Sequence, residues 1–211
     1  VPGQEWLIVD RRLAAARAYV RQHGLDRISG AEPRAPLGIV AAGKTYSDVI
    51  QAFADLGVAQ AELAGSGVRI LKLAMTYPLV EETVLELAQS VDVLLVVEEK
   101  RPFIETQLRA ILHEAGCSAR VVGKRDREGR PLVSQVGELD ASQLVSVLMK
   151  LSPELAARRA RVIHRKPRLL SVQPPPRPPE YCSGCPHNSS TVVPEGALVG
   201  GGVGCHGIMY F

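Results

Sequence analysis

The sequence predicts an α/β fold in which a parallel β-sheet carries helices on both of its faces. Two observations support this prediction. Short apolar runs alternate with longer amphipathic segments four times between residues 37 and 151. The run at 93–97 is apolar throughout, which is typical of a strand that is buried on both faces. Each crossover between successive strands is expected to be right-handed.

Local patterns place the individual elements in chain order. Residues 11–23 have a helical pattern with Leu13 and Val20 on one face, and Gly24 is placed to end that helix. Residues 30–36 are rich in glycine and proline and predict a linker. The predicted strands are residues 37–42, 68–73, 93–97 and 120–122, and the predicted helices that follow them are residues 46–56, 80–91, 103–115 and 141–151.

The chain changes character after residue 151. A short basic helix is predicted over residues 153–163, and the prolines of residues 174–179 favour an extended conformation that resists packing. We interpret this stretch as an inter-domain linker, with a recognition motif for an SH3-like module as the alternative. The predicted organisation is an N-terminal helix and linker (1–35), an α/β domain (36–151), a basic proline-rich linker (152–180) and the incomplete start of a second α/β domain (181–211).

Composition and charge exclude several classes of protein. The net charge of +3 gives no strong argument for nucleic acid or a membrane surface as partner. No apolar run approaches the roughly 20 residues that a membrane span needs, and the first residues lack the pattern of a signal peptide. We therefore expect a soluble, cytoplasmic protein. The missing initial methionine and the apolar end at 208–211 suggest a fragment of a longer chain.

Three of the four cysteines cluster near the C-terminus, and they predict a metal or cluster site. Cys182 and Cys185 are separated by Ser183 and Gly184, which permit a tight turn that aims both thiols at one centre. Cys205 could supply a third thiolate, and thiolates favour zinc or iron–sulfur. The fourth ligand is either a histidine (His187 or His206) or a group outside this chain. A disulfide is the less favoured alternative, because nothing indicates an oxidising compartment.

Residues 38–45 match the Walker A pattern of a phosphate-binding loop, and this is a competing hypothesis. The pattern requires a buried strand before its first glycine and a flexible loop after it. Here the preceding residues 32–36 contain two prolines, and the apolar run lies inside the motif. We therefore expect residues 37–42 to be a strand, with Gly43 as the turn into the next helix.

Polar residues follow three predicted strands at the edge where open α/β sheets bind ligands. They are Gly43-Lys44-Thr45, Met75-Thr76-Tyr77-Pro78 and Glu98-Glu99-Lys100-Arg101. The four charges at 98–101 are interpreted first as structural or as salt bridges across a subunit interface. Residues 124–130 are interpreted as a solvated turn.

Several long stretches resemble one known family. They are "GIVAAGKTYSDVIQAFADLGV", "ILKLAMTYPL", "VLLVVEEKRPFIETQLR" and "VVGKRDREGRPLV", followed by "YCSGCPHNSSTVVPEG" and "GVGCH". The first four resemble the middle of indolepyruvate ferredoxin oxidoreductases, which are 2-oxoacid:ferredoxin oxidoreductases. The last two resemble the start of the thiamine-diphosphate-binding domain of that family. The resemblance extends from about Leu13 to the end of the chain.

The resemblance implies an activity and its cofactors. The family converts an aryl 2-oxoacid such as indole-3-pyruvate, with coenzyme A, into acyl-CoA and carbon dioxide, and two electrons pass to ferredoxin. Thiamine diphosphate with Mg²⁺ supplies the carbanion chemistry, and iron–sulfur clusters carry the electrons. Residues 36–151 would be the transketolase C-terminal-like domain, whose role is largely architectural. A homo-oligomer is also expected, with no nucleic acid and no membrane as partner.

The resemblance also assigns residues. Cys182, Cys185 and Cys205 correspond to three ligands of a [4Fe–4S] cluster whose fourth ligand lies outside this chain, and Gly204, Cys205 and His206 fall near the thiamine. Two family features are absent: the Gly-Asp-Gly…Asn motif that binds magnesium and diphosphate, and the glutamate-bearing domain that precedes this region. The chain alone is therefore not expected to catalyse the reaction. A zinc-stabilised binding module remains the alternative from another class.

Overall fold

The computed structural model describes residues 2–159, 178–200, 202–205 and 207. By its internal contacts the chain divides into two units, residues 1–164 and 165–211, which are treated separately below. The predicted linker lies largely outside the described residues, as does the end of the helix predicted over 153–163. Its beginning is described as α7 (Pro153–Arg159).

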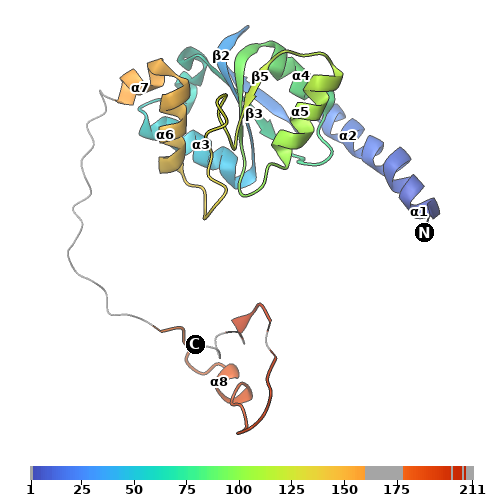
Figure 1. Ribbon diagram of the computed structural model, residues 1–211, viewed down its shortest axis with the longest axis vertical. Coiled ribbons are helices and arrows are strands. Elements are labelled where there is room, and N and C mark those ends of the chain that lie inside the picture. The colour runs from blue at the N-terminus through green and yellow to red at the C-terminus, as the bar shows by residue number, and fades with distance from the viewer. Residues whose placement is uncertain (1, 160–177, 201, 206, 208–211) are drawn as a thin grey trace. The chain divides into compact units, whose positions relative to one another are not determined.

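The first unit contains a five-stranded sheet in the order β1-β3-β2-β4-β5 (Figure 1). Strands β2, β3, β4 and β5 are parallel in adjacent pairs, as the alternating sequence pattern predicts. β2 has β3 on one side and β4 on the other, so the strand order reverses between β2 and β4. The strands are β1 (Arg27–Gly30), β2 (Ala35–Ala42), β3 (Val68–Leu73), β4 (Val91–Val97) and β5 (Arg120–Val122).

Strand β1 pairs antiparallel with β3 at the edge of the sheet and is not predicted from the sequence. Its four residues are alternately exposed and half-buried, and two of them are Arg27 and Gly30, so no apolar run marks them as a strand. Pairing with β3 determines their conformation instead, and the hydrogen bond from Ala31 N to Val68 O (2.9 Å) extends that pairing. The sheet is therefore mixed rather than purely parallel.

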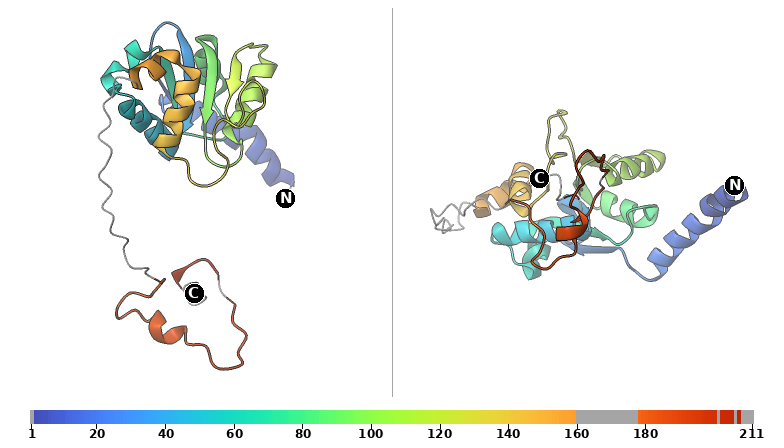
Figure 2. Two further views of the ribbon diagram at one scale, coloured as in Figure 1. Left: turned by 60° about the vertical axis from the view of Figure 1, so that its left-hand side comes forward. Right: turned by 90° about the horizontal axis from the view of Figure 1, so that it is seen from below.

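Helices cover both faces of the sheet, as predicted (Figures 1 and 2). On one face Phe53 and Leu144 pack against Ile39 and Leu95, and on the other Leu87 and Leu108 pack among the opposite side chains of the same strands. The first face carries α3 (Gly43–Asp55), the 3-10 helix η2 (Gln60–Ser66), α6 (Ala141–Leu151) and α7, and the second carries α4 (Glu81–Gln89) and α5 (Ile104–Glu114).

A long helical segment precedes the sheet and extends away from it (Figure 1). It consists of α1 (Pro2–Trp6), a π-helical stretch η1 (Leu7–Arg12) and α2 (Leu13–Gln22), and is longer than the helix predicted at 11–23. Only its last turns reach the domain, where Val20 is buried and Arg17 pairs with Glu81 at 3.3 Å. In the second unit, the only α-helix among the described residues is α8 (His187–Ser190).

Candidate functional site

The Walker A hypothesis is wrong, because its residues form a central strand. β2 runs through the supposed phosphate loop and bonds to neighbouring strands on both sides. Ile39, Val40 and Ala41 are fully buried, so this backbone cannot wrap around a phosphate. Gly43 makes the predicted turn into α3, with a φ of 51° that glycine adopts easily.

The lysine and threonine of that motif instead connect strands at the carboxyl edge of the sheet. The Thr45 hydroxyl donates toward the carbonyl oxygens of Ala42 (2.9 Å) and Val97 (3.1 Å), which links the end of β4 to the start of α3. Lys44 Nζ donates to the Asp48 carboxylate (2.8 Å) and to Leu139 O (2.6 Å). Both side chains therefore have structural partners.

Glu98 binds the first turn of α5 from the end of β4. Glu98 as a whole residue is only 6 % exposed. One carboxylate oxygen accepts hydrogen bonds from the amides of Phe103 (3.0 Å) and Ile104 (2.7 Å), and the other accepts from Glu105 N at 3.1 Å. A carboxylate is favourable at this position because the first amides of a helix lack partners within the helix and carry positive partial charge.

Lys124 and Glu105 extend this buried polar network, and neither was identified from the sequence. Lys124 belongs to the segment predicted as a solvated turn, yet it is only 4 % exposed. Its ammonium donates to the carbonyl oxygens of Glu98 and Ser134, while Glu105 accepts from Lys124 N at 3.0 Å. Burial lowers the pKa of Lys124, and the charges of nearby glutamates oppose that shift. The one sequence signal for Lys124 is its position just after a short strand.

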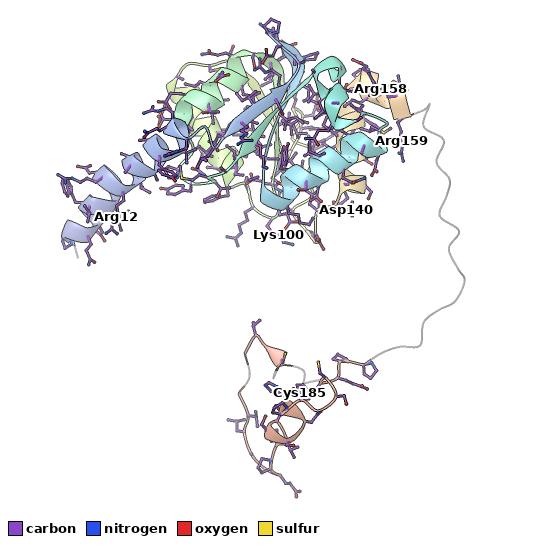
Figure 3. All side chains as sticks on the ribbon, turned by 180° about the vertical axis from the view of Figure 1, so that it is seen from behind. Arg12, Lys100, Asp140, Arg158, Arg159 and Cys185 are labelled. Atoms are coloured by element: carbon purple, nitrogen blue, oxygen red, sulfur yellow. The ribbon has the colours of Figure 1, made fainter. Side chains whose placement is uncertain are left out.

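These polar side chains hold residues 134–139, which we call the closing segment, across the carboxyl edge of the sheet. Lys44 and Lys124 bind its carbonyl oxygens from the ends of β2 and β5, and Lys100 binds Gly137 O from the end of β4. Glu99 accepts from Leu139 N at 3.2 Å. Lys100 and Asp140 lie at the same edge of the domain (Figure 3). The edge where α/β sheets commonly bind ligands is therefore occupied by the chain itself.

The cysteine pair of the second unit lies on a tight turn. Cys185 N donates to Cys182 O (2.9 Å), and Gly184 between them has a φ of 74°, which glycine adopts easily. Asn188 Nδ2 binds Cys182 O at 3.3 Å. Cys185 Sγ lies 3.2 Å from His187 Nδ1, and the His187 ring stacks on Tyr181 with centroids 5.5 Å apart. Cys185 is labelled in Figure 3.

The chemistry of this turn fits part of a soft-metal site. None of the four cysteines forms a disulfide; Cys182 is exposed and Cys185 is half-buried. Cys205 is also a free, exposed thiol, but the described residues contain no group of three or more cysteine, histidine or acidic side chains close enough to hold a metal ion. The structure thus places Cys182 and Cys185 on one tight turn, and the assignment of the three thiolates as ligands stays a prediction. His206 lies outside the described residues.

The assignment of Gly204, Cys205 and His206 to the vicinity of thiamine diphosphate stays a prediction, as does the binding of magnesium. In the part of the chain that the structure describes, no helix is both long and apolar enough to cross a bilayer.

Comparison with known proteins identifies a family and several relatives. Residues 26–173 match the indolepyruvate oxidoreductase domain. The chain is 28 % identical over 189 residues to the indolepyruvate oxidoreductase subunit IorA of Pyrococcus abyssi, covering 90 % of this chain and 27 % of that subunit. It is 31 % identical over 157 residues to IorA of Thermococcus kodakarensis, covering 74 % and 22 % respectively. The chain thus spans about a quarter of the length of these relatives.

Two solved structures also match, each with a TM-score of 0.42. One is a split-gene transketolase in an inactive beta4 tetramer, with 19 % identity, 59 % of this chain and 41 % of that chain covered. The other is a 2-oxoglutarate:ferredoxin oxidoreductase from Magnetococcus marinus, with 16 % identity, 66 % of this chain and 23 % of that chain covered. The order and direction of the strands define the fold independently of these two matches.

Proposed function

Because the chain belongs to the indolepyruvate oxidoreductase family, we propose that it forms part of a cytoplasmic 2-oxoacid:ferredoxin oxidoreductase. The match over residues 26–173 carries this proposal. In the proposed reaction, an aryl 2-oxoacid such as indole-3-pyruvate reacts with coenzyme A to give acyl-CoA and carbon dioxide. The two electrons released pass to oxidised ferredoxin. Thiamine diphosphate with Mg²⁺ would supply the decarboxylation chemistry when bound in the enzyme that contains this chain.

The two units of this chain have different proposed roles. The α/β domain supports the enzyme architecturally, because its carboxyl edge is covered by the closing segment and its charged side chains are used to hold that segment. The proposed chemistry lies in the second unit. There Cys182 and Cys185 would supply two thiolate ligands of a [4Fe–4S] cluster, Cys205 a third, and a residue outside this chain the fourth. A homo-oligomer is proposed as well.

The test of this function is the reduction of ferredoxin by the enzyme that contains this chain. We expect reduction that requires both indole-3-pyruvate and coenzyme A, and a large loss of electron transfer in Cys185→Ser. Cys117→Ser is the matched control, because Cys117 lies in the α/β domain, away from the proposed ligands in sequence, and should keep the activity. A Cys185→Ser enzyme that reduces ferredoxin at the wild-type rate would contradict the cluster assignment. Equal rates with pyruvate, 2-oxoglutarate and indole-3-pyruvate would contradict the substrate class.

One observation favours a second candidate, a structural zinc site. The 3.2 Å separation of Cys185 Sγ and His187 Nδ1 places a nitrogen donor beside a thiol, and zinc accepts mixed sulfur and nitrogen ligands. Metal analysis of protein purified without oxygen separates the two candidates. Iron together with acid-labile sulfide supports the cluster, whereas one zinc per chain without sulfide supports the structural site.

A further inference from the structure

A cavity of about 690 Å³ opens in the α/β domain between the turn at 126–130 and the C-terminal end of α6. Its volume lies within the range of small-molecule sites. Its lining includes Arg127, Leu132 and Lys150, none of which takes part in the function proposed above. The cavity is also separate from the residues that hold the closing segment at the carboxyl edge.

The cavity exists because one face of the sheet is incompletely covered at its edge. Helices α3 and α6 cover the centre of this face, but β5 is only three residues long and is followed by a turn instead of a helix. Three apolar side chains on the cavity wall, Val93, Leu132 and Leu151, therefore remain only half-buried. Together they form an apolar part of the cavity lining that is still in contact with water.

The turn that forms one wall is held by its own hydrogen bonds. Asp126 accepts from the amides of Glu128 (3.0 Å) and Arg130 (2.8 Å), and its other oxygen accepts from Arg130 Nε at 2.7 Å. Arg130 also binds Glu128 at 2.8 Å. The acidic side chains of this wall are thus already paired with Arg130, and the wall is ordered without a ligand, which lowers the entropic cost of binding.

Two cationic side chains that line the cavity take no part in these ion pairs. Among the residues that the structure describes, neither Arg127 nor Lys150 has a hydrogen-bond or ion-pair partner. They come from different elements, the turn and the last residues of α6, and both line the same cavity as the three apolar side chains. We propose that this cavity binds a small amphipathic carboxylate, with its apolar body on Val93, Leu132 and Leu151 and its carboxylate between Arg127 and Lys150.

Three probes test this proposal on the whole chain. Phenylacetate has the apolar body and the charge, phenylacetamide has the body alone, and acetate has the charge alone. We expect saturable binding of phenylacetate, seen as NMR shifts of the amides of Val93, Val122 and Leu132. Phenylacetamide should bind at least about 10-fold more weakly, since hydrogen bonds to a charged group are stronger than those to a neutral one. Acetate should produce no saturable shift.

Variants locate the charge requirement. Arg127→Gln and Lys150→Gln should each weaken phenylacetate binding by about 10-fold, whereas Arg12→Gln, an exposed change on the N-terminal helical segment, should leave the affinity unchanged. The proposal is overturned if phenylacetate causes no saturable shift at millimolar concentration. It is equally overturned if phenylacetamide binds as tightly as phenylacetate, a comparison made on the unmodified chain. Because the probes bear on the α/β domain alone, failure here leaves the oxidoreductase proposal standing.

Discussion

Replacing Glu98 by alanine should destabilise the α/β domain. Its position in a run of four charged residues, 98–101, does not by itself indicate such a loss. The carboxylate accepts three backbone amide hydrogen bonds at the start of α5, and two of these amides, those of Ile104 and Glu105, are buried. A buried donor left without a partner costs roughly 1–3 kcal/mol. Two such donors therefore predict a loss of about 3 kcal/mol in the free energy of unfolding. This figure allows for water that enters the vacated space and bonds to part of the freed amides.

Urea unfolding of the whole chain, monitored by far-ultraviolet circular dichroism, measures this loss. The slope of the unfolding free energy against urea concentration should be the same in the variant and in the wild type. Glu98→Gln keeps one acceptor oxygen, so its loss should lie between zero and that of Glu98→Ala. Glu86→Ala is the matched control, because Glu86 is exposed on α4 and such surface changes usually stay within about 0.5 kcal/mol. If the unfolding free energies of Glu98→Ala and Glu86→Ala differ by less than about 0.5 kcal/mol, Glu98 does not stabilise the start of α5 as proposed.

Three further predictions test neighbouring parts of the same edge. Gly123→Ala should lower the free energy of unfolding in urea by about 1–3 kcal/mol. The added methyl group would collide with the Glu105 carboxylate and break its hydrogen bond from Lys124 N, so an unchanged stability would contradict this packing. Burial lowers the pKa of Lys124 below 10.5, so the unfolded chain binds more protons between that lowered pKa and 10.5. The stability of wild type relative to Lys124→Met should therefore rise with pH through that window, and a flat difference would count against the buried ammonium. Hydrogen bonds from Ser142 and from the amide of Gln143 hold the pKa of Asp140 below 3.8, so its contribution to stability should be present above pH 3.8 and be lost as pH falls through the folded-state pKa. Asp140→Asn, which keeps an acceptor at the start of α6, should lack this acid dependence, and an NMR titration of the Asp140 carboxyl checks the direction of its shift.

The structure confirms the central elements that periodicity predicted. The apolar strands and the amphipathic helices between them depend mainly on local pattern, because burial on one or both faces dictates the residue type at each position. Helix α6 has the predicted bounds, 141–151, and the strand at 37–42 lies within β2. The same strand excludes the Walker A hypothesis. The sequence already indicates this, because prolines precede the motif and an apolar run lies inside it.

The misses share one physical origin. Strand β1 has no apolar run, and only its pairing with β3 makes it a strand. Lys124 lies in a run of charged residues that is typical of a solvated turn, yet it is buried between carbonyl oxygens of Glu98 and Ser134. Those partners are 26 and 10 residues away in sequence, so local pattern contains no information about them.

The sequence by itself determined the layered α/β architecture, the turn that brings Cys182 and Cys185 together, and the resemblance that predicted the family. These follow from local pattern, or from residues that are close in the chain. Only the tertiary structure decided what the polar residues at the carboxyl edge do. Glu98, Lys124 and Lys44 hold the closing segment and the start of α5 there. Two of these charges, Glu98 and Lys124, are buried and therefore need partners, which the fold brings from distant parts of the chain.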